Sequence, residues 1–383
     1  MTTNQSHSMK IHLVGGAVRD KLLGLPVKDH DWVVTNATPE QMRKQGYTPV
    51  GQDFPVFLHP ETKEEYALAR TERKSGHGYT GFVFHASPDV TLEQDLLRRD
   101  LTINAMAEAE DGTLIDPYNG YQDLNQRLLR HVSPAFREDP LRILRVARFA
   151  ARFQHLGFAI AEETMTMMKE MVDSGEASHL VPERVWQETH RALMEPTPEV
   201  YFQTLQDCGA LSVVMPEWQP FLTTDCCLKA VRLAADNNAD DSVRFACLFA
   251  DAGGSSIEEL DQLAQRLRFP ARFKELGMLV FTSESRLWKT LENLNGETLI
   301  SLFEETDALR RPERFSDYLE ACRYIAEARG NTLPDHALQK VTVALTVCQA
   351  VNASEIVQQG FKGREIGEQL RLARIKAINQ HSS

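Results

Sequence analysis

The sequence contains few cysteines, and none of them is arranged to hold a metal ion. All six lie in the second half of the 383-residue chain, none forms a C-x-x-C pair, and no cluster of histidines lies beside them. A zinc site is therefore not expected. We expect the cysteines to be reduced and buried like other apolar residues, which indicates a cytoplasmic location.

Long apolar runs and an excess of basic residues are also absent. No stretch approaches the roughly 18 uncharged apolar residues that a transmembrane helix needs. The first eight residues, MTTNQSHS, lack the apolar core of a signal peptide, so we expect a disordered lead, with Met9 as an alternative start. The net charge of −12 disfavours nonspecific binding to nucleic acids, so any contact with RNA would depend on local basic patches.

The pattern of the chain changes near residue 135. Before this point, β-branched runs such as residues 29–35 alternate with turns and helices, and residues 38–46 have Thr38 as N-cap and Gly46 as a stop. After it, helical periodicity continues to residue 377. The sequence thus predicts an α+β fold, with a first domain at residues 9–137, a helical neck at 138–215, and a helical body and tail at 216–383.

Asp29 and Asp31 flank His30 directly before the apolar run WVVT. If residues 29–35 form one strand, the two carboxylates share a face, with their Cα atoms about 7 Å apart. Mg²⁺ in proteins is commonly held by one or two carboxylates together with substrate phosphates. The pair is therefore a candidate magnesium site, with a merely polar surface as the alternative when the triplet is taken alone.

Gly15 and Gly16 end the predicted strand at residues 11–16 and precede a predicted helix. Glycines allow backbone N–H groups to approach a phosphate, and Arg19 lies one turn into the helix, where it can add a charge-assisted contact. The alternative for the glycine pair alone is a tight connection between strand and helix.

The helix predicted at residues 140–153 carries four arginines on one face. Its other face has Leu141, Leu144, Ala147 and Ala151 at helical spacing. Taken alone, the arginine face indicates a solvated cationic surface.

Together these motifs resemble the DNA polymerase β nucleotidyltransferase superfamily, and in particular its class II branch, which contains the CCA-adding enzymes (tRNA nucleotidyltransferases) and the bacterial poly(A) polymerases. LVGGAVRD with DHDWVV resembles the first motif of the branch, and RRDLTINAMA (98–107) the second. DPYNG (116–120) resembles the third, and EDPLRILRVARF (138–149) the fourth. The resemblance implies a polymerase-β-like nucleotidyltransferase head, with a mixed sheet and flanking helices, followed by a helical neck, body and tail.

The resemblance also implies catalytic roles. Asp29 and Asp31 would bind Mg²⁺, activate the 3′-hydroxyl of tRNA and neutralise the triphosphate. Glu65 is the candidate for a third carboxylate on a neighbouring strand, with an exposed strand glutamate as the alternative.

Further residues would bind the nucleotide. Gly16, Arg19 and Arg99 would contact phosphates, and Asp100 and Asn104 would lie near the ribose. Asp139 and Arg142 would recognise the Watson–Crick edge of the incoming base, because cytosine and adenine each present one amino group and one ring acceptor. Arg145 and Arg148 would also reach the nucleotide phosphates.

The function implied is the stepwise addition of C, C and A to the tRNA 3′ end from CTP and ATP, with tRNA as the partner, no DNA partner, and a monomer favoured. A poly(A) polymerase or a CC-only or A-only enzyme is the alternative, and a noncatalytic RNA-binding protein is a more distant one. Residues 67–82 resemble the flexible loop that CCA-adding enzymes use for the terminal A. Residues 50–61 contain acids where poly(A) polymerases usually carry a basic run.

Gammaproteobacterial relatives often carry a C-terminal HD phosphohydrolase domain, whose metal site needs histidines. In this chain Ala250 occupies the position of the paired histidine, and no histidine occurs between His190 and His336. We therefore expect a shortened, degenerate HD region without phosphohydrolase activity, in a body that binds tRNA.

Overall fold

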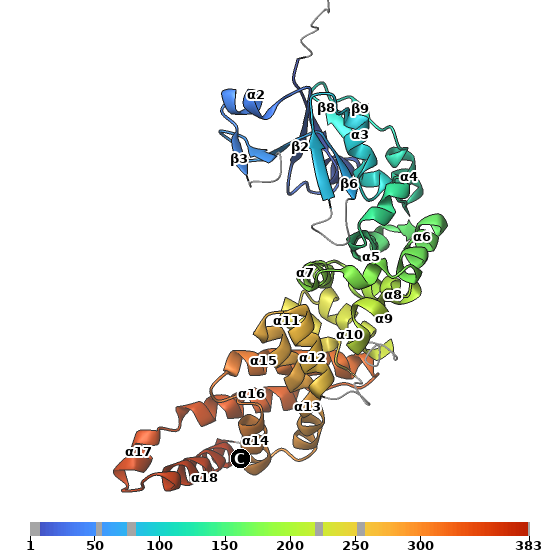
Figure 1. The fold of residues 1–383 in the computed structure, drawn as a ribbon. Coiled ribbons are helices and arrows are strands. Elements are labelled where there is room, and N and C mark those ends of the chain that lie inside the picture. Colours follow the sequence, from blue (N-terminus) through green and yellow to red (C-terminus); the bar gives the residue numbers. More distant parts are fainter. Residues whose placement is uncertain (1–7, 51–55, 75–81, 219–224, 251–256, 382–383) are drawn as a thin grey trace, which may run out of the picture. The chain divides into compact units, whose positions relative to one another are not determined.

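The structure is a computed structural model that describes residues 8–50, 56–74, 82–218, 225–250 and 257–381 (Figure 1). The chain divides into two units, Met1–Val214 and Met215–Ser383. Among the described helices, none combines the length and the hydropathy that crossing a bilayer requires.

A mixed seven-stranded sheet occupies the first part of the first unit, as the sequence predicted (Figure 1). The strand order is β3-β4-β5-β2-β1-β8-β9, with β2 parallel to β5 and antiparallel to β1. The strands are β1 (Lys10–Val14), β2 (Asp31–Thr35), β3 (Thr48–Val50), β4 (Val56–Leu58), β5 (Glu65–Leu68), β8 (Ala107–Ala109) and β9 (Leu114–Ile115).

Two apolar cores cover the two faces of this sheet. Val33 of β2 packs in one core with residues such as Leu96 of helix α3 (Leu92–Leu97). Val34 packs in the other with Met42 of helix α2 (Pro39–Lys44). Because side chains alternate along a strand, Asp31 points to the same face as Val33, whereas Trp32 joins the opposite core.

The predicted helix at residues 38–46 is confirmed as α2. Thr38 accepts a hydrogen bond from the backbone N–H of Gln41, whose side chain accepts one from the backbone N–H of Thr38 in return, which forms a capping box. Gly46 follows the helix with φ +89°, a conformation that glycine adopts without strain.

The strand predicted at residues 29–35 is shorter than expected, because β2 begins at Asp31. Its register with β1 runs from Lys10 opposite Thr35 to Val14 opposite Asp31. After Val14 the chain turns at Gly15, with φ +70°, into helix α1 (Gly16–Leu22). Asp29 and His30 therefore have no strand partner on β1 and lie in the loop before β2.

The segment expected to be a flexible loop, residues 67–82, is partly regular. Strands β6 (Arg70–Lys74) and β7 (Phe82–Ala86) pair as an antiparallel two-stranded sheet, with Arg70 opposite Ala86. Five cross-strand pairs hold the two ends of the segment together. Residues 75–81, between the strands, lie outside the described residues, as do residues 51–55 of the acid-containing segment.

The DPYNG motif forms the start of helix α4 (Gly120–Gln126). The Asp116 carboxylate accepts hydrogen bonds from the backbone N–H groups of Gly120 (2.7 Å) and Tyr121 (2.9 Å). Gly120 packs closely against the short helix η2 (Thr102–Asn104), and a Cβ added there would lie 2.2 Å from the carbonyl oxygen of Thr102. The motif thus joins α4 to the segment that carries Asp100 and Asn104.

Helices make up most of the remaining first unit, as predicted, and α5 packs against α7 and α8. The longer helices of this part are α5 (Leu141–Phe153), α6 (Glu162–Asp173), α7 (Pro182–Leu193), and α8 (Glu199–Asp207). The apolar face predicted for α5 is buried. Its arginine face is not a solvated surface, because Arg142 and Arg148 are each only 8% exposed. Charged partners that lie far away in the sequence enclose this face.

The second unit is helical, also as predicted. Its helices are α10 (Asp225–Asp236), α11 (Asp241–Cys247), α12 (Ile257–Leu267), α13 (Ala271–Glu292), α14 (Gly296–Glu305), α15 (Pro312–Ala328), α16 (Asp335–Ala350), α17 (Ala353–Gln358) and α18 (Arg364–His381). Phe245 of α11 contacts the rings of Trp218, Phe249, Phe269 and Phe273 at centroid distances of 5.1–5.5 Å. All six cysteines are buried, as expected, and none of them forms a disulfide bond with another described residue. Residues 251–256 of the predicted HD remnant lie outside the described residues.

Two ion pairs connect α5 to the segments around the sheet. The buried carboxylate of Asp100 accepts hydrogen bonds from Arg145 of α5 at 2.6 and 2.7 Å. Asp20 of α1 is bound by Arg152 at 2.9 Å. Burial alone would raise the pKa of Asp100, but the charge of Arg145 and hydrogen bonds from Asn104 and Arg145 hold that pKa well below its usual range.

We predict that Gly120→Ala destabilises the first unit by about 3 kcal/mol, because the added methyl group meets a backbone carbonyl that cannot move without displacing η2. Gly367→Ala is the matched control, because its Cβ would have no atom within 4 Å and helical alanine is favoured over glycine by about 0.5–1 kcal/mol. Thermal unfolding of both variants measures the difference. Equal melting temperatures for Gly120→Ala and the wild type would contradict the close packing.

We predict that Asp100→Asn lowers the free energy of unfolding at pH 7 by about 2 kcal/mol. The cost is below the ~3–5 kcal/mol typical of a fully buried pair, because water reaches the Arg145 side chain. Since the folded pKa lies below the unfolded value of about 3.9, the contribution is complete above that pH and is lost as the pH falls towards the folded pKa. Denaturant unfolding between pH 7 and 3 should show a constant difference between the two proteins down to about pH 5, and a difference that has begun to narrow at pH 3.

Candidate active site

A cavity of about 600 Å³ in the first unit brings together most of the residues predicted to carry the chemistry. Nine arginines and four aspartates line it, so its wall is strongly cationic although the chain as a whole is acidic. The lining residues are Gly15, Gly16, Arg19, Asp29, Asp31, Arg98, Arg99, Asp100, Asn104, Asp139, Leu141, Arg142, Arg145, Arg148, Phe149, Arg152, Arg184 and Arg191. Such a wall is suited to a ligand with several negative charges.

Asp29 and Asp31 both line the cavity and are both exposed. Neither carboxylate forms a hydrogen bond or an ion pair with another residue that the structure describes. His30 lies on the other side of the chain, where its ring is 3.2 Å from Glu64 and stacks on Trp32. Two unpaired carboxylates within a wall of arginines fit a divalent cation, because oxygen ligands of this kind are the ones that Mg²⁺ prefers.

Glu65 is the first residue of β5 and lies directly opposite Asp31 in the parallel register. Neighbouring strands are about 4.8 Å apart, so the two residues are adjacent on the sheet. Glu65 is exposed and is not among the described residues that line the cavity. Its adjacency to Asp31 is compatible with a third carboxylate, and its exposure is compatible with the alternative of a surface residue.

Arg19 is held rigidly beside the Gly15-Gly16 turn. Its guanidinium donates to Asp20 at 2.8 Å and to the side-chain oxygen of Asn104, and it lies 4.9 Å from the ring centroid of Phe153. Its side chain is 3% exposed, and this burial lowers its pKa, although the charge of Asp20 opposes the shift. A fixed guanidinium of this kind is preorganised for a phosphate.

Asp95 orients both arginines of the RRD motif. Its buried carboxylate accepts from Arg98 at 2.8 Å and from Arg99 at 3.4 Å, and also from the backbone N–H of Arg70 at 3.2 Å. Arg99 approaches the turn so closely that a Cβ on Gly15 would lie 2.7 Å from its guanidinium. Gly15 therefore suits the positive φ of the turn, and a larger residue there would also displace the guanidinium of Arg99.

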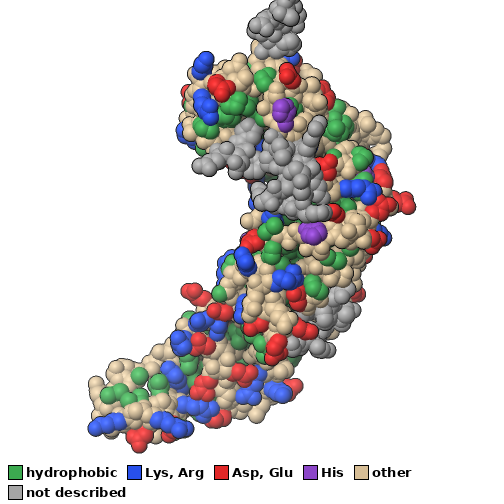
Figure 2. Space-filling view, viewed as in Figure 1, with side chains coloured by type: hydrophobic (Ala, Val, Ile, Leu, Met, Phe, Trp, Pro, Cys, Tyr) green, Lys and Arg blue, Asp and Glu red, His purple; other side chains and the backbone are tan. Residues whose placement is uncertain are grey.

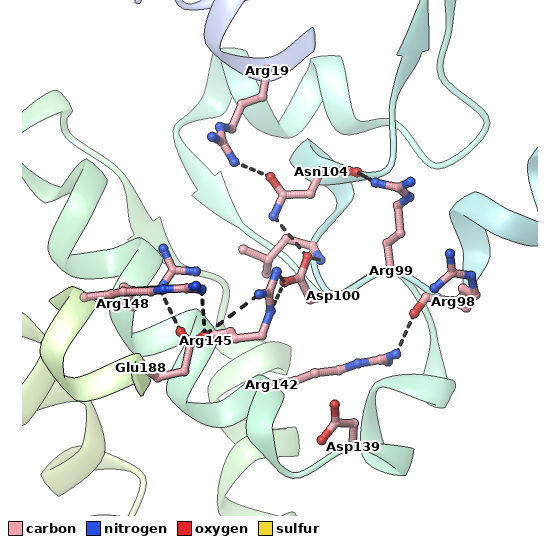
Figure 3. Close-up of polar contacts among 12 residues, drawn as sticks. Arg19, Arg98, Arg99, Asp100, Asn104, Asp139, Arg142, Arg145, Arg148 and Glu188 are labelled. Atoms are coloured by element: carbon pink, nitrogen blue, oxygen red, sulfur yellow. Dashed lines mark hydrogen bonds and ion pairs between the residues drawn. The ribbon is translucent and has the colours of Figure 1, made fainter. Parts of the chain in front are cut away.

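A chain of hydrogen bonds runs from Arg19 through Asn104 to Asp100 and Arg145 (Figure 3). Asn104 donates to Asp100 at 3.0 Å, and the backbone N–H of Leu101 donates to the same oxygen at 2.9 Å. Asp100 and Asn104, the residues predicted to lie near the ribose, are thus hydrogen-bonded to one another. Their arrangement joins the phosphate-side arginine to helix α5.

Asp139 and Arg142 lie at the start of α5, and both line the cavity. Arg142 donates to the carbonyl oxygens of Ala135 (2.9 Å) and Arg98 (2.5 Å), which fixes its guanidinium (Figure 3). One oxygen of Asp139 accepts from the backbone N–H of Leu141 at 3.0 Å, and the other lies 3.4 Å from Arg184. The pair presents one fixed donor group and one fixed acceptor group to the cavity.

Arg145 and Arg148 are held by carboxylates rather than exposed for a ligand. Arg148 donates to Glu188 of α7 at 2.7 Å and to Glu195 at 3.4 Å, and its side chain is 9% exposed. Burial raises the pKa of Glu195, although the charges of Arg148 and Arg152 oppose that shift. Arg145 keeps 33% of its side chain exposed beside Asp100. A phosphate would therefore have easier access to Arg145 than to Arg148.

Sequence reasoning missed several residues of this cavity. Arg98 belongs to the motif RRDLTINAMA and Arg152 to the helix predicted at residues 140–153, but neither is predicted as a site residue. The residues of α7 were not predicted at all: Arg184, Arg191, and Glu188 behind the wall. The segment PERVWQETHRALM gives the signal, because Arg184, Glu188 and Arg191 fall on one face at spacings of four and three.

Two family comparisons match the chain. Residues 11–130 match the family of the poly A polymerase head domain. Residues 157–222 match the family described as the probable RNA and SrmB-binding site of polymerase A. The first match contains three of the four motifs and nearly all of the seven-stranded sheet.

Solved structures of CCA-adding enzymes have the same fold over nearly the whole chain. The Bacillus stearothermophilus CCA-adding enzyme in complex with CTP is 25% identical, with a TM-score of 0.71, and the match covers 98% of this chain and 90% of that one. The Thermotoga maritima CCA-adding enzyme complexed with tRNA is 23% identical, with a TM-score of 0.69, covering 97% and 88% of the two chains. An apo form of a CCA-adding enzyme gives 23% identity and a TM-score of 0.72, covering 97% and 88%.

These matches agree with the fold and with the order of the motifs. The chain therefore contains a head domain of the poly A polymerase family at residues 11–130 and has, over nearly its whole length, the fold of the CCA-adding enzymes.

Proposed function

We propose that this chain adds C, C and A stepwise to the 3′ end of tRNA, from CTP and ATP and without a nucleic-acid template. The observation that carries the proposal is that one cavity contains two carboxylates without a partner among the described residues, a cationic wall and a fixed Asp–Arg pair. The CTP complex and the tRNA complex among the similar enzymes support the same substrates. In each step the 3′-oxygen bonds to the α-phosphorus, the hydroxyl proton is lost, and pyrophosphate leaves.

Asp29 and Asp31 would hold Mg²⁺, since both are exposed to the cavity and free of other described partners. When bound, the metal ion supplies Lewis-acid activation of the 3′-hydroxyl and charge neutralisation of the triphosphate. Glu65, adjacent to Asp31 on β5, would assist as a third carboxylate.

The triphosphate would lie against Gly16, Arg19 and Arg99, with Arg145 and Arg148 as further cations. Arg145 is the more accessible of these two, and each would have to share its guanidinium between a phosphate and its carboxylate partner. Asp100 and Asn104 would position the ribose from the same network. Holding the reactants in place is the main contribution that such residues can make to phosphoryl transfer.

Asp139 and Arg142 would select the base. A guanidinium donor matches the ring acceptor of cytosine or adenine, and a carboxylate acceptor matches the amino group. Arg142 is fixed by two backbone carbonyls, so it presents its donors without loss of conformational entropy on binding. Uracil and guanine present a donor where the ring acceptor is needed, and are disfavoured.

The domains would divide the work. We assign transfer to the head at residues 9–137, base selection to the neck at 138–215, and tRNA binding to the body and tail at 216–383. The absence of histidines between His190 and His336 argues against phosphohydrolase activity in the body. The alternative is a poly(A) polymerase, or an enzyme that adds only CC or only A. Incubation of the protein and RNA with each nucleotide in turn distinguishes these activities.

Transcripts of tRNA ending before CCA, after C, and after CC should each be completed to CCA and then extended no further. Each is incubated with Mg²⁺, CTP and ATP, with one of the two nucleotides labelled at a time, and the products are resolved on a sequencing gel. Asp31→Ala should lower incorporation by roughly 10³-fold or more, because the metal ion supplies several kcal/mol of charge stabilisation in the transition state. A long A tail on any RNA would assign the chain to the poly(A) polymerases. Incorporation that survives Asp31→Ala would refute the metal assignment.

Arg142→Ala should reduce the discrimination of CTP and ATP over UTP and GTP by roughly ten- to hundredfold, because one matched pair contributes about 1–3 kcal/mol. The quantity measured is kcat/KM for each nucleotide on the same transcript. Arg137→Ala is the control, since its guanidinium binds Glu170 on α6 and is not part of the described cavity wall. Unchanged selection in a folded Arg142→Ala protein would refute the role in base recognition.

A further inference from the structure

A second cavity, of about 560 Å³, adjoins the first one within the same unit. Its walls come from the loop between α1 and β2, the end of α5, and the end of α7 with the residues after it. The two cavities share Arg148, Arg152 and Arg191 as lining residues. These three arginines therefore contact both cavities.

The second cavity has cations that are accessible to a ligand. Lys28 is exposed and has no hydrogen bond or ion pair with another described residue. Arg191 keeps 63% of its side chain exposed and has Glu188 only at 3.8 Å. Arg152 is 30% exposed and uses one nitrogen for Asp20. Glu195 is the acid of this wall and is bound by Arg148, so the wall attracts an anion.

The rest of the lining is apolar and suited to a sugar and a base. Met194 is 47% exposed, which is unusual for a side chain of its type, and Leu25, Pro26 and Pro196 lie around the same cavity. His190, another lining residue, stacks on Trp186 at 5.7 Å. A volume of this size is within the usual range of about 300–1,000 Å³ for small-ligand sites.

Lys28 precedes Asp29 directly, so their Cα atoms are about 3.8 Å apart. A ligand group held by Lys28 in the second cavity is thus next to the carboxylate pair at the edge of the first. Nucleotidyl transfer needs two substrates at this place, the triphosphate on one side and a 3′-hydroxyl on the other. The first cavity contains the groups for the triphosphate and the base, and leaves the position of the 3′-hydroxyl unassigned.

We propose that the second cavity binds the 3′-terminal nucleotide of the RNA substrate. Lys28 and Arg191 contact its phosphate, and Met194 and Pro196 pack against its ribose and base. The proposal rests on the proposed function, because it assigns the site of the RNA substrate in that reaction. A phosphate group could also belong to departing pyrophosphate, and measurements of RNA binding and of inhibition by pyrophosphate separate the two sources.

The test uses the full chain with Lys28→Ala and Arg191→Ala combined. Arg43→Ala with Lys44→Ala is the matched control, because it removes the same charge from exposed positions of α2 that line neither cavity. The measurement is the Kd for tRNA lacking CCA, by fluorescence anisotropy with Mg²⁺ and without nucleoside triphosphate. The Kd should rise by roughly tenfold or more in the first variant, because charge-assisted hydrogen bonds to phosphate are removed, and stay unchanged in the control.

Two further readouts distinguish this site from a merely structural effect. The slope of log Kd against log salt should decrease by about 1 for each phosphate that the variant no longer binds. In Lys28→Ala alone, the KM for CTP at saturating tRNA should remain that of the wild type, because Lys28 does not line the first cavity, whereas Arg191 lines both. If the variant instead changes only the inhibition by inorganic pyrophosphate, the cavity is a product exit and the proposal is overturned.

Crosslinking locates the nucleotide directly. A tRNA lacking CCA with 4-thiouridine as its 3′-terminal nucleotide should crosslink, on irradiation, to the peptide that contains Met194. Crosslinking elsewhere in the chain would overturn the proposal. Because neither binding nor crosslinking needs nucleotide transfer, a protein that fails to add CCA would still report on this cavity, and the two failures are distinguishable.

Discussion

The ion pair between Asp100 and Arg145 is the contact on which the geometry of the active site depends. The carboxylate is buried and receives Arg145, Asn104 and the backbone N–H of Leu101. Through Asn104 it orients Arg19 beside the glycine turn. Through Arg145 it fixes helix α5, whose first residues carry the proposed base-selecting pair. One carboxylate therefore couples the proposed phosphate-binding residues to the proposed base-selecting residues.

The charge of the cavity explains how an acidic protein can bind polyanions. The chain has a net charge of −12, yet nine arginines and only four aspartates line one cavity. Figure 2 shows acidic and basic side chains interspersed over the visible face rather than gathered into one basic surface. The cationic field is thus concentrated where low exposure limits screening by salt. Burial of Arg19 and Arg148 costs desolvation energy, which Asp20 and Glu188 offset by ion pairing.

The two adjoining cavities suggest a division of the first unit between two substrates. Arginines 148, 152 and 191 line both cavities, and Lys28 of the second cavity directly precedes Asp29 of the first. Guanidinium groups shared in this way could contact phosphates in either cavity. In this arrangement a triphosphate and an RNA end would bind next to each other, each in its own cavity.

The sequence by itself determined the sheet-containing head, the helical remainder, the capped helix after Thr38 and the buried cysteines. These features follow from side-chain periodicity and local capping, which involve residues within one or two turns of each other. It also indicated the carboxylate pair and the arginine-rich helix, because their motifs are contiguous. The strand predicted at residues 29–35 is longer than β2, which begins at Asp31. The reason is that a strand extends only as far as its partner, and β1 ends at Val14, where Gly15 turns the chain.

Only the tertiary structure decided what each charged side chain contacts. The arginines of α5 have the pattern of a solvated face, but Arg148 binds Glu188 from 40 residues away, and Arg145 binds Asp100 from 45 residues away. No local pattern contains such pairs, because α7 and the RRD segment reach α5 only after the chain has folded. The same holds for Arg184 and Arg191, which join the cavity from a helix with no recognised motif. Whether an arginine is available to a ligand or already neutralised depends on these distant partners, and so the composition of the site is a property of the fold.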